Sequence, residues 1–110
     1  MTDTPSIGEL EQLILLAILR LGSNATGLSI AHELEAQAGR RLSRGALYTT
    51  LDRLEAKGFL RWKLEAGGSE RRGLPKRMYV VLPRGVAALQ TSQRILRRMW
   101  RGLDMLKGQS

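Results

Sequence analysis

The segment SRGALYTTLDRLEAKG, residues 43–58, places hydroxyl, aromatic and guanidinium groups on one face of a short helix. Groups of these kinds donate hydrogen bonds to phosphate oxygens and to base edges in the major groove of DNA. The face carries Arg44, Tyr48, Thr49, Asp52 and Arg53. A solvated helix face with one amphipathic tyrosine is the alternative, and this segment alone leaves both open.

Basic residues are concentrated in the last two thirds of the chain. Residues 1–39 hold one base and five acids (net −4), residues 40–77 hold eleven and four (+7), and residues 78–110 hold six and one (+5). A polyanion is the partner that such a distribution favours. An anionic membrane surface fits less well, because turns interrupt the basic middle segment and leave no long basic amphipathic helix.

The helix of residues 43–58 has a predicted start and stop. Ser43 can act as the N-cap, because its hydroxyl accepts a backbone N–H that the first turn leaves open, and Gly58 is a C-terminal stop. Leu42 is placed to pack against Leu47 as a hydrophobic staple. The buried stripe consists of Leu47, Leu51 and Leu54, at helical spacing.

A first helix is expected over about residues 7–21. Ser6 and Glu9 have the spacing of a capping box at its start. Apolar residues cover most of its circumference, which predicts a central helix covered by its neighbours and by a second subunit.

A second helix is expected to open at Thr26-Gly27 and to end before Gly39, with Ile30, Leu34 and Ala38 facing inward. The linker of residues 39–42 contains a glycine and leads directly into the helix of residues 43–58. Two short helices joined in this way match the helix-turn-helix plan. Arg40 lies in the turn, where it can contact a phosphate or remain solvated.

After Gly58 the hydrophobic period changes from about 3.6 to 2, which predicts a strand over residues 60–65. Residues 66–76, AGGSERRGLPK, are rich in turn formers and bases, and residues 77–82 form the returning strand. Such a hairpin is the wing of a winged helix, and Trp62 is expected at its root. Its cations are Arg71, Arg72, Lys76 and Arg77. Wing cations reach phosphates or the minor groove, and a solvated loop is the alternative.

A last helix is expected over about residues 84–106, with Pro83 in its first turn. A domain this small does not need a helix of this length to close its core, so its far half is predicted to pack across a two-fold axis. The expected dimer interface consists of Leu96, Met99, Trp100, Leu103 and Leu106. The predicted fold is mainly α with a small β-hairpin. Residues 1–82 form a winged helix-turn-helix and residues 83–110 a long dimerisation helix, within one continuous domain.

Other function classes find little support. The chain has no cysteine, which fits a reducing cytoplasm and excludes a thiolate metal site. His32 stands alone, and residues 67–73, GGSERRG, lack the Lys-Ser/Thr of a phosphate loop, so neither an enzyme, a metal nor a cofactor is expected. No apolar run is long enough to span a membrane, and the N-terminus lacks the features of a signal peptide.

Three segments together resemble the PadR family of transcriptional regulators, in the short subfamily with a single terminal helix. They are GELEQLILLAILRLG (8–22), ELEAQAGRRLSRGALYTTLDRLEAKGFL (33–60) and GLPKRMYVVLPRGVAAL (73–89). The resemblance implies a homodimeric winged-helix repressor whose two recognition helices enter successive major grooves of an inverted repeat. It also implies that Ser43, Tyr48 and Thr49 approach DNA.

This chain departs from the family pattern in the wing motif and before the last helix. Leu74 stands where the wing motif has a cation, so the wing contacts are expected to be weaker or to shift to Arg71 and Arg72. Leu82 stands where the family usually has a threonine that caps the last helix. Some members bind aromatic or hydrophobic effectors through a tryptophan on the terminal helix. Trp100 is similarly placed, and plain interface packing is the simpler interpretation of it.

The sequence thus predicts a homodimeric, sequence-specific DNA-binding regulator. The expected regulator is a repressor that a small aromatic or hydrophobic effector releases from DNA. The groove contacts are expected from Arg44, Tyr48, Thr49 and Arg53. The phosphate contacts are expected from Ser43, Arg40, Arg71, Arg72, Lys76 and Arg77. A chromatin-like, non-specific DNA-binding protein is the main alternative, and a protein-interaction module is another.

Overall fold

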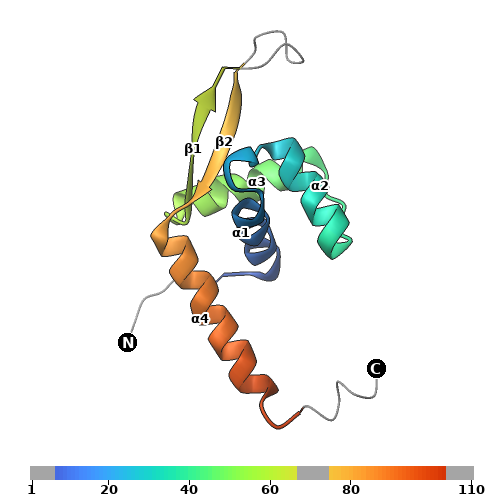
Figure 1. Ribbon diagram of the computed structural model, residues 1–110, viewed down its shortest axis with the longest axis vertical. Helices are drawn as coiled ribbons and strands as arrows, with labels where there is room; N and C mark the ends of the chain where they lie inside the picture. Colours follow the sequence, from blue (N-terminus) through green and yellow to red (C-terminus); the bar gives the residue numbers. More distant parts are fainter. Residues whose placement is uncertain (1–6, 67–74, 104–110) are drawn as a thin grey trace.

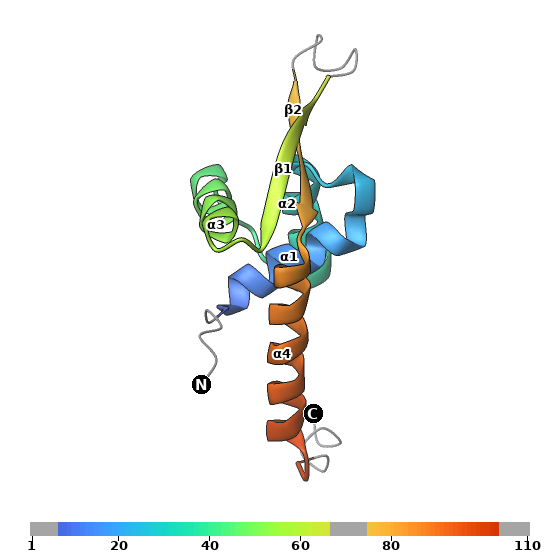
Figure 2. The same ribbon diagram turned by 90° about the vertical axis from the view of Figure 1, so that its left-hand side faces the viewer.

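The computed structural model describes residues 7–66 and 75–103. Within these ranges the chain is mainly helical, with one two-stranded antiparallel hairpin, as predicted (Figure 1). The elements are α1 (Glu9–Leu21), α2 (Gly27–Ala38), α3 (Arg44–Ala56), β1 (Leu60–Glu65), β2 (Lys76–Val81) and α4 (Pro83–Trp100), with a short 3-10 turn at Gly22–Asn24 before α2. The hairpin and α4 extend from the helical body in opposite directions (Figure 2).

Helix α1 lies at the centre of the helical body and supplies Ile14, Leu15 and Ile18 to the core. It begins at Glu9, two residues later than expected, and the predicted box between Ser6 and Glu9 is wrong. Gly8 is the N-cap instead, and its backbone N–H donates to Glu11 Oε1 at 2.9 Å; Ser6 lies outside the described residues.

Burial of α1 on several sides is only partly confirmed. Leu16 and Leu19 remain 44% and 47% exposed in the single chain. One apolar face of α1 therefore packs in the core, and another apolar face is exposed in the single chain.

The helix-turn-helix forms through the caps that the sequence indicates. Thr26 Oγ1 accepts from Ser29 N–H at 3.1 Å at the start of α2, and Gly39 ends that helix in the left-handed region at φ +65°. Ser43 Oγ accepts from Ala46 N–H at 3.1 Å and starts α3. The apolar stripe of α3 is buried as predicted: Leu47, Leu51 and Leu54.

Helix α2 differs from the prediction at one position. Ile30 and Leu34 are buried, but Ala38 is exposed. Ala38 is the last residue of α2, next to the turn, and no core surface reaches it.

The hairpin pairs Leu60 with Val81 at its base and Glu65 with Lys76 at its outer end. β2 begins one residue earlier than predicted. A backbone bond from Tyr79 N–H to Ala25 O, 2.9 Å, anchors β2 to the segment before α2. Leu60 is buried and Trp62 is half-buried, but Leu64 is 59% exposed because the outer end of the hairpin extends beyond the helical body (Figures 1 and 2).

Helix α4 begins at Pro83 without a side-chain cap, as the departure at Leu82 predicts. It ends at Trp100 rather than near residue 106, because Arg101 takes an extended conformation and Gly102 lies at φ +84°. Leu103 is therefore outside the helix, contrary to the prediction, and Leu106 lies outside the described residues. Every residue from 93 to 100 is exposed in the single chain.

Candidate nucleic-acid interface

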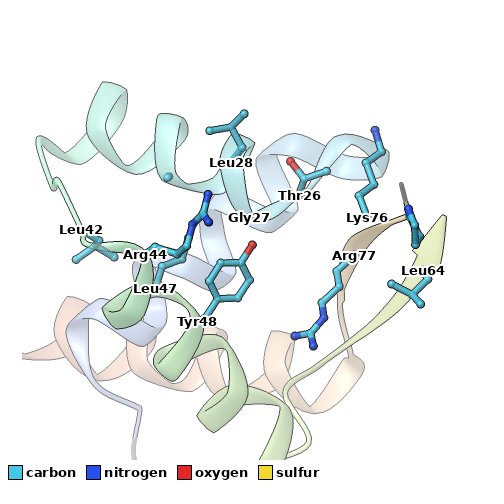
Figure 3. Close-up of a pocket in the computed structure, with 12 residues that line it drawn as sticks. Thr26, Gly27, Leu28, Leu42, Arg44, Leu47, Tyr48, Leu64, Lys76 and Arg77 are labelled. Carbon is cyan, nitrogen blue, oxygen red and sulfur yellow. The ribbon is translucent and has the colours of Figure 1, made fainter. Parts of the chain in front are cut away.

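A cleft of about 620 Å³ opens between the N-terminal half of α3, the first turn of α2 and the hairpin (Figure 3). Side chains from all three elements line it: Thr26, Gly27, Leu28, Ala31, Leu42, Arg44, Leu47, Tyr48, Leu64, Pro75, Lys76 and Arg77. The helix that the sequence analysis singled out thus shares one concave surface with the hairpin.

The charged side chains that line this cleft are all basic. They are Arg44 from α3 and Lys76 and Arg77 from β2, and the described lining residues include no aspartate or glutamate. Cations gathered in a concave, partly apolar surface focus a positive potential on it. An extended polyanion is the partner that matches this charge pattern.

The four predicted groove contacts fall into two pairs. Arg44 and Tyr48 line the cleft, where Tyr48 is half-buried and its ring points toward Gly27 (Figure 3). Thr49 and Arg53 do not line the cleft, and both are exposed on α3. The polar face of α3 therefore extends from the cleft onto an open surface, which can enter a groove of DNA.

Two of the predicted phosphate contacts have partners within the chain. Ser43 caps α3 through its oxygen and keeps its hydroxyl proton to donate. Arg40 contacts Glu9 at the start of α1 through Nη2 and Oε1, which the sequence analysis did not foresee. The Glu9 side chain is 76% exposed and the Arg40 side chain 40%, and ion pairs that water reaches contribute little stability. In the single chain the Arg40 guanidinium is therefore engaged by an acid of α1.

Of the wing cations, the structure describes Lys76 and Arg77, which lie on β2 rather than in the connecting loop. Arg71 and Arg72 lie outside the described residues. Arg77 is half-buried, and its guanidinium carbon is 4.1 Å from the centroid of the Trp62 ring. This contact depends on strand register, so no local sequence signal could have revealed it.

Two tyrosines lie near Arg77. The neighbouring Tyr79 hydroxyl is the main cause that raises the pKa of Arg77, and Asp52 and Tyr48 add to it. Burial raises the pKa of Tyr79. Among the described residues, Tyr79 Oη has no hydrogen-bond partner of normal geometry. The Arg77 guanidinium therefore lies between its own hairpin, which carries Tyr79, and helix α3, which carries Asp52 and Tyr48.

A partly buried ion pair holds the other end of α3. Lys57 Nζ lies 2.9 and 2.8 Å from the two carboxylate oxygens of Glu11, which is 6% exposed. Burial alone would raise the pKa of Glu11, but the hydrogen bonds from Lys57 and Gly8 outweigh it and lower that pKa below its ordinary value. The pair fixes the C-terminus of α3 to the N-terminus of α1.

A second groove, of about 560 Å³, lies between α1 and α4. Its lining residues are mainly apolar and include three glutamines and one arginine: Gln12, Leu16, Leu19, Val86, Leu89, Gln90, Gln93, Leu96, Arg97 and Trp100. The groove includes two residues of the expected dimer interface, Leu96 and Trp100. Met99 and Leu103 are exposed outside it.

None of the helices in residues 7–66 and 75–103 combines the length and the apolar character that crossing a membrane requires. The same ranges contain no group of three or more histidines and acids placed to hold a metal ion. The basic cleft and the apolar groove are two concave features of the described surface.

A known protein family resembles this chain in sequence. The profile of the "Transcriptional regulator PadR-like family" matches residues 15–91. A comparison with curated protein sequences gave no match.

Solved structures share the fold. A PadR family transcriptional regulator from Eggerthella lenta is 26% identical, with a TM-score of 0.65 over 89% of this chain and 85% of that one. A PadR family regulator from Clostridium difficile is 21% identical, with a TM-score of 0.63 over 93% and 97%. PadR of Bacillus subtilis, solved in complex with operator DNA, is 20% identical, with a TM-score of 0.62 over 77% of this chain and 46% of that one.

The winged helix-turn-helix built from α1 to β2 and the profile match over most of the chain lead to one conclusion. This chain belongs to the PadR-like family of transcriptional regulators.

Proposed function

We propose that this chain is a homodimeric repressor that binds an inverted-repeat operator through α3 and the hairpin. The observation that carries the proposal is the cleft whose charged lining residues, among those described, are all basic. The polar face of α3 beside the cleft supplies donors for base edges. PadR of Bacillus subtilis, which has the same fold, was solved with operator DNA, and this supports a DNA partner.

In this proposal α3 enters the major groove and the residues around the cleft hold the phosphate backbone. Arg44, Tyr48, Thr49 and Arg53 make the groove contacts. Ser43, Lys76 and Arg77 contact phosphates, and Arg40 joins them by exchanging Glu9 for a phosphate oxygen. Arg71 and Arg72 of the wing loop complete the set of phosphate contacts.

The dimer forms through the groove between α1 and α4. Leu16 and Leu19 on α1 and Leu96, Met99 and Trp100 on α4 are exposed apolar side chains in the single chain. A second copy that inserts its own α4 would bury them about a two-fold axis. Residues 1–82 then bind DNA and residues 83–110 join the copies, with Leu103 and Leu106 continuing the interface beyond α4. The two recognition helices should lie about 34 Å apart, one turn of DNA.

Repression follows from occupancy, because a dimer on an operator that overlaps a promoter excludes polymerase. A small aromatic or hydrophobic effector at the groove would change the angle between the copies and so release the DNA. Trp100 lines this groove, so binding of a planar aromatic compound should quench its fluorescence. Quenching that survives Trp100→Phe would contradict an effector site there. The cytoplasm is the compartment that fits a regulator without cysteine.

The proposal is tested by fluorescence anisotropy with two duplexes, the DNA upstream of the chain's own gene and a shuffled copy, at two salt concentrations. A preference of at least about 10³-fold for the upstream DNA supports a sequence-specific autoregulator. Equal and salt-sensitive binding to both duplexes would favour a non-specific DNA-binding protein. Absence of binding to either duplex would contradict the proposed DNA partner.

A further inference from the structure

The cation that β2 directs into the cleft rests on an aromatic ring. In the hairpin register Trp62 faces Tyr79, and Leu64 faces Arg77. Trp62 and Arg77 are therefore diagonal neighbours on one face of the hairpin. The 4.1 Å between the guanidinium carbon and the ring centroid places the two planar groups in direct contact. Arginine, unlike lysine, can stack on an aromatic ring in this way.

The ring itself is held by α3. Trp62 Nε1 donates to Glu55 Oε1 at 3.1 Å, and Glu55 belongs to the last turn of α3. The indole is half-buried and packs against the core. A continuous chain of contacts thus runs from α3 through Trp62 on β1 to Arg77 on β2. It connects the two elements that the proposed function places on DNA.

We propose that Trp62 is a positioning residue for DNA binding: its indole holds the Arg77 guanidinium at a fixed place relative to α3. The proposal rests on the proposed function, because it assumes that Arg77 contacts a phosphate. An unsupported arginine samples many rotamers, and ordering it on binding costs affinity. Stacking on Trp62 orders the guanidinium before DNA arrives and leaves its N–H edges available to phosphate oxygens.

Lys76 provides a matched comparison. It precedes Arg77, lines the same cleft and pairs with Glu65 in the hairpin register. The described ring contacts include Arg77 on Trp62 but none for Lys76. A change at Trp62 should therefore alter the contribution of Arg77 and leave that of Lys76 unchanged.

The first measurement needs no DNA. In the NMR spectrum of the full chain, the side-chain protons of Arg77, assigned by their loss in Arg77→Gln, should be shifted upfield by the indole ring current. Trp62→Leu should return them to ordinary positions, and Trp62→Phe should retain part of the shift. Ordinary positions in the unchanged chain would show that the stack is absent and overturn the proposal.

The second measurement is a double-mutant cycle with a 30-base-pair random duplex, because a phosphate contact does not depend on sequence. Trp62→Leu and Arg77→Gln should each weaken binding about fivefold, and the double variant should be no weaker than Arg77→Gln alone. Each single variant should also reduce the slope of log K against log salt by about one. A cycle of Trp62→Leu with Lys76→Gln should be additive.

Two further variants separate positioning from folding. Trp62→Phe keeps an aromatic surface and should restore most of the affinity, while Arg77→Lys keeps the charge without the stacking plane and should bind more weakly than the unchanged chain but more tightly than Arg77→Gln. Thermal unfolding of each variant confirms that it is folded at the temperature of the assay. Additive losses for Trp62 and Arg77, in a chain that binds DNA, would overturn the positioning role alone. Absence of DNA binding by the unchanged chain would overturn the proposed function and this role together.

Discussion

Tyr48 of α3 packs directly against Gly27, the first residue of α2. A Cβ on Gly27 would stand 2.9 Å from Tyr48 Cζ and closer still to the hydroxyl. The ring therefore occupies the space that any other residue at position 27 would fill. This contact fixes the Tyr48 side chain at the cleft wall, where α3 meets the first turn of α2.

Gly27→Ala should consequently weaken DNA binding more than it weakens the fold. The ring can rotate away from the new methyl group, so we expect a loss of about 1 kcal/mol in the free energy of unfolding. DNA affinity should fall by about tenfold, a free-energy cost near 1.4 kcal/mol, because Tyr48 leaves its place in the cleft. Denaturant unfolding and anisotropy measure the two effects.

The control for this change uses the same pair. In a Tyr48→Ala background the alanine at position 27 meets no ring, so Gly27→Ala should cost no further affinity. Wild-type DNA affinity in Gly27→Ala would contradict a role for the Tyr48 position in binding.

The partly buried pair of Glu11 and Lys57 predicts a pH-dependent stability. Glu11→Gln should lower the free energy of unfolding at pH 7 by about 2 kcal/mol, because it removes charge-assisted bonds to a nearly buried carboxylate. The pKa of Glu11 is lower in the folded chain than its ordinary value of 4.5. The stabilisation is therefore present above about pH 4.5 and is lost as the pH falls through the folded pKa.

Urea unfolding of both proteins between pH 3 and pH 7 checks this sign. The difference between wild type and Glu11→Gln should be constant above about pH 5 and shrink toward pH 3. A difference that grows as the pH falls would show that the folded pKa of Glu11 is raised instead. Glu65→Gln, at an exposed position on β1, is the matched control and should change stability little at any pH.

Local signals were sufficient for much of the fold. Ser43, Thr26 and Gly39 were predictable as caps because each acts within a few residues of its own position. The end of α4 was missed for the opposite reason. The leucine spacing continues past residue 100 and predicted a longer helix. Gly102, at φ +84°, is nevertheless a stop signal of the same kind as Gly58, at φ +77°.

Part of the candidate site was also predictable from local sequence signals, and part was not. Arg44 and Tyr48 were identified because helical periodicity places them on one face. The pairing of Arg40 with Glu9 joins residues 31 positions apart, and the stack of Arg77 on Trp62 depends on strand register. Neither contact has a local sequence signal, so both became visible only when the elements were assembled.

Gly85 fixes α4 against the start of the hairpin. A Cβ there would stand 2.9 Å from Val81 Cγ1 and 3.1 Å from the Phe59 carbonyl carbon, and closer still to the carbonyl oxygen. Backbone atoms cannot rotate away as a side chain can, so Gly85→Ala should cost about 3 kcal/mol in the free energy of unfolding. Calorimetry should show the lower midpoint.

Gly45 is the matched control for that change, because nothing lies within 4 Å of a Cβ built there. It lies within α3, where alanine is favoured over glycine, so Gly45→Ala should stabilise the fold by about 0.5 kcal/mol. Equal effects of the two substitutions would contradict the tight packing at Gly85.

The apolar surface of α4 predicts the oligomeric state. Leu96→Asp combined with Met99→Asp should give a monomer in sedimentation, because each carboxylate would be buried in the proposed interface. Both side chains are more than half exposed in the single chain, so the monomer should remain folded. Ala87→Asp, exposed on α4 outside the groove, should remain a dimer. A double variant that still sediments as a dimer would exclude this interface.

The contact between Glu9 and Arg40 predicts that removal of the Glu9 carboxylate increases the affinity for DNA. Glu9→Gln frees the Arg40 guanidinium from its partner in α1, and exposed pairs of this kind contribute about 0.2–1 kcal/mol. DNA binding should tighten by about two- to fivefold, since Arg40 no longer has to exchange a carboxylate for a phosphate. Stability should fall slightly, because Glu9 also lies in the first turn of α1, where a negative charge is favourable.

Arg40→Gln tests the same relationship from the other side. It should weaken DNA binding and reduce the salt slope by about one, because one phosphate contact is lost. In that background Glu9→Gln should no longer tighten binding beyond the small effect of removing a distant negative charge. An unchanged salt slope in Arg40→Gln would show that Arg40 serves only to tie the turn between α2 and α3 to the start of α1.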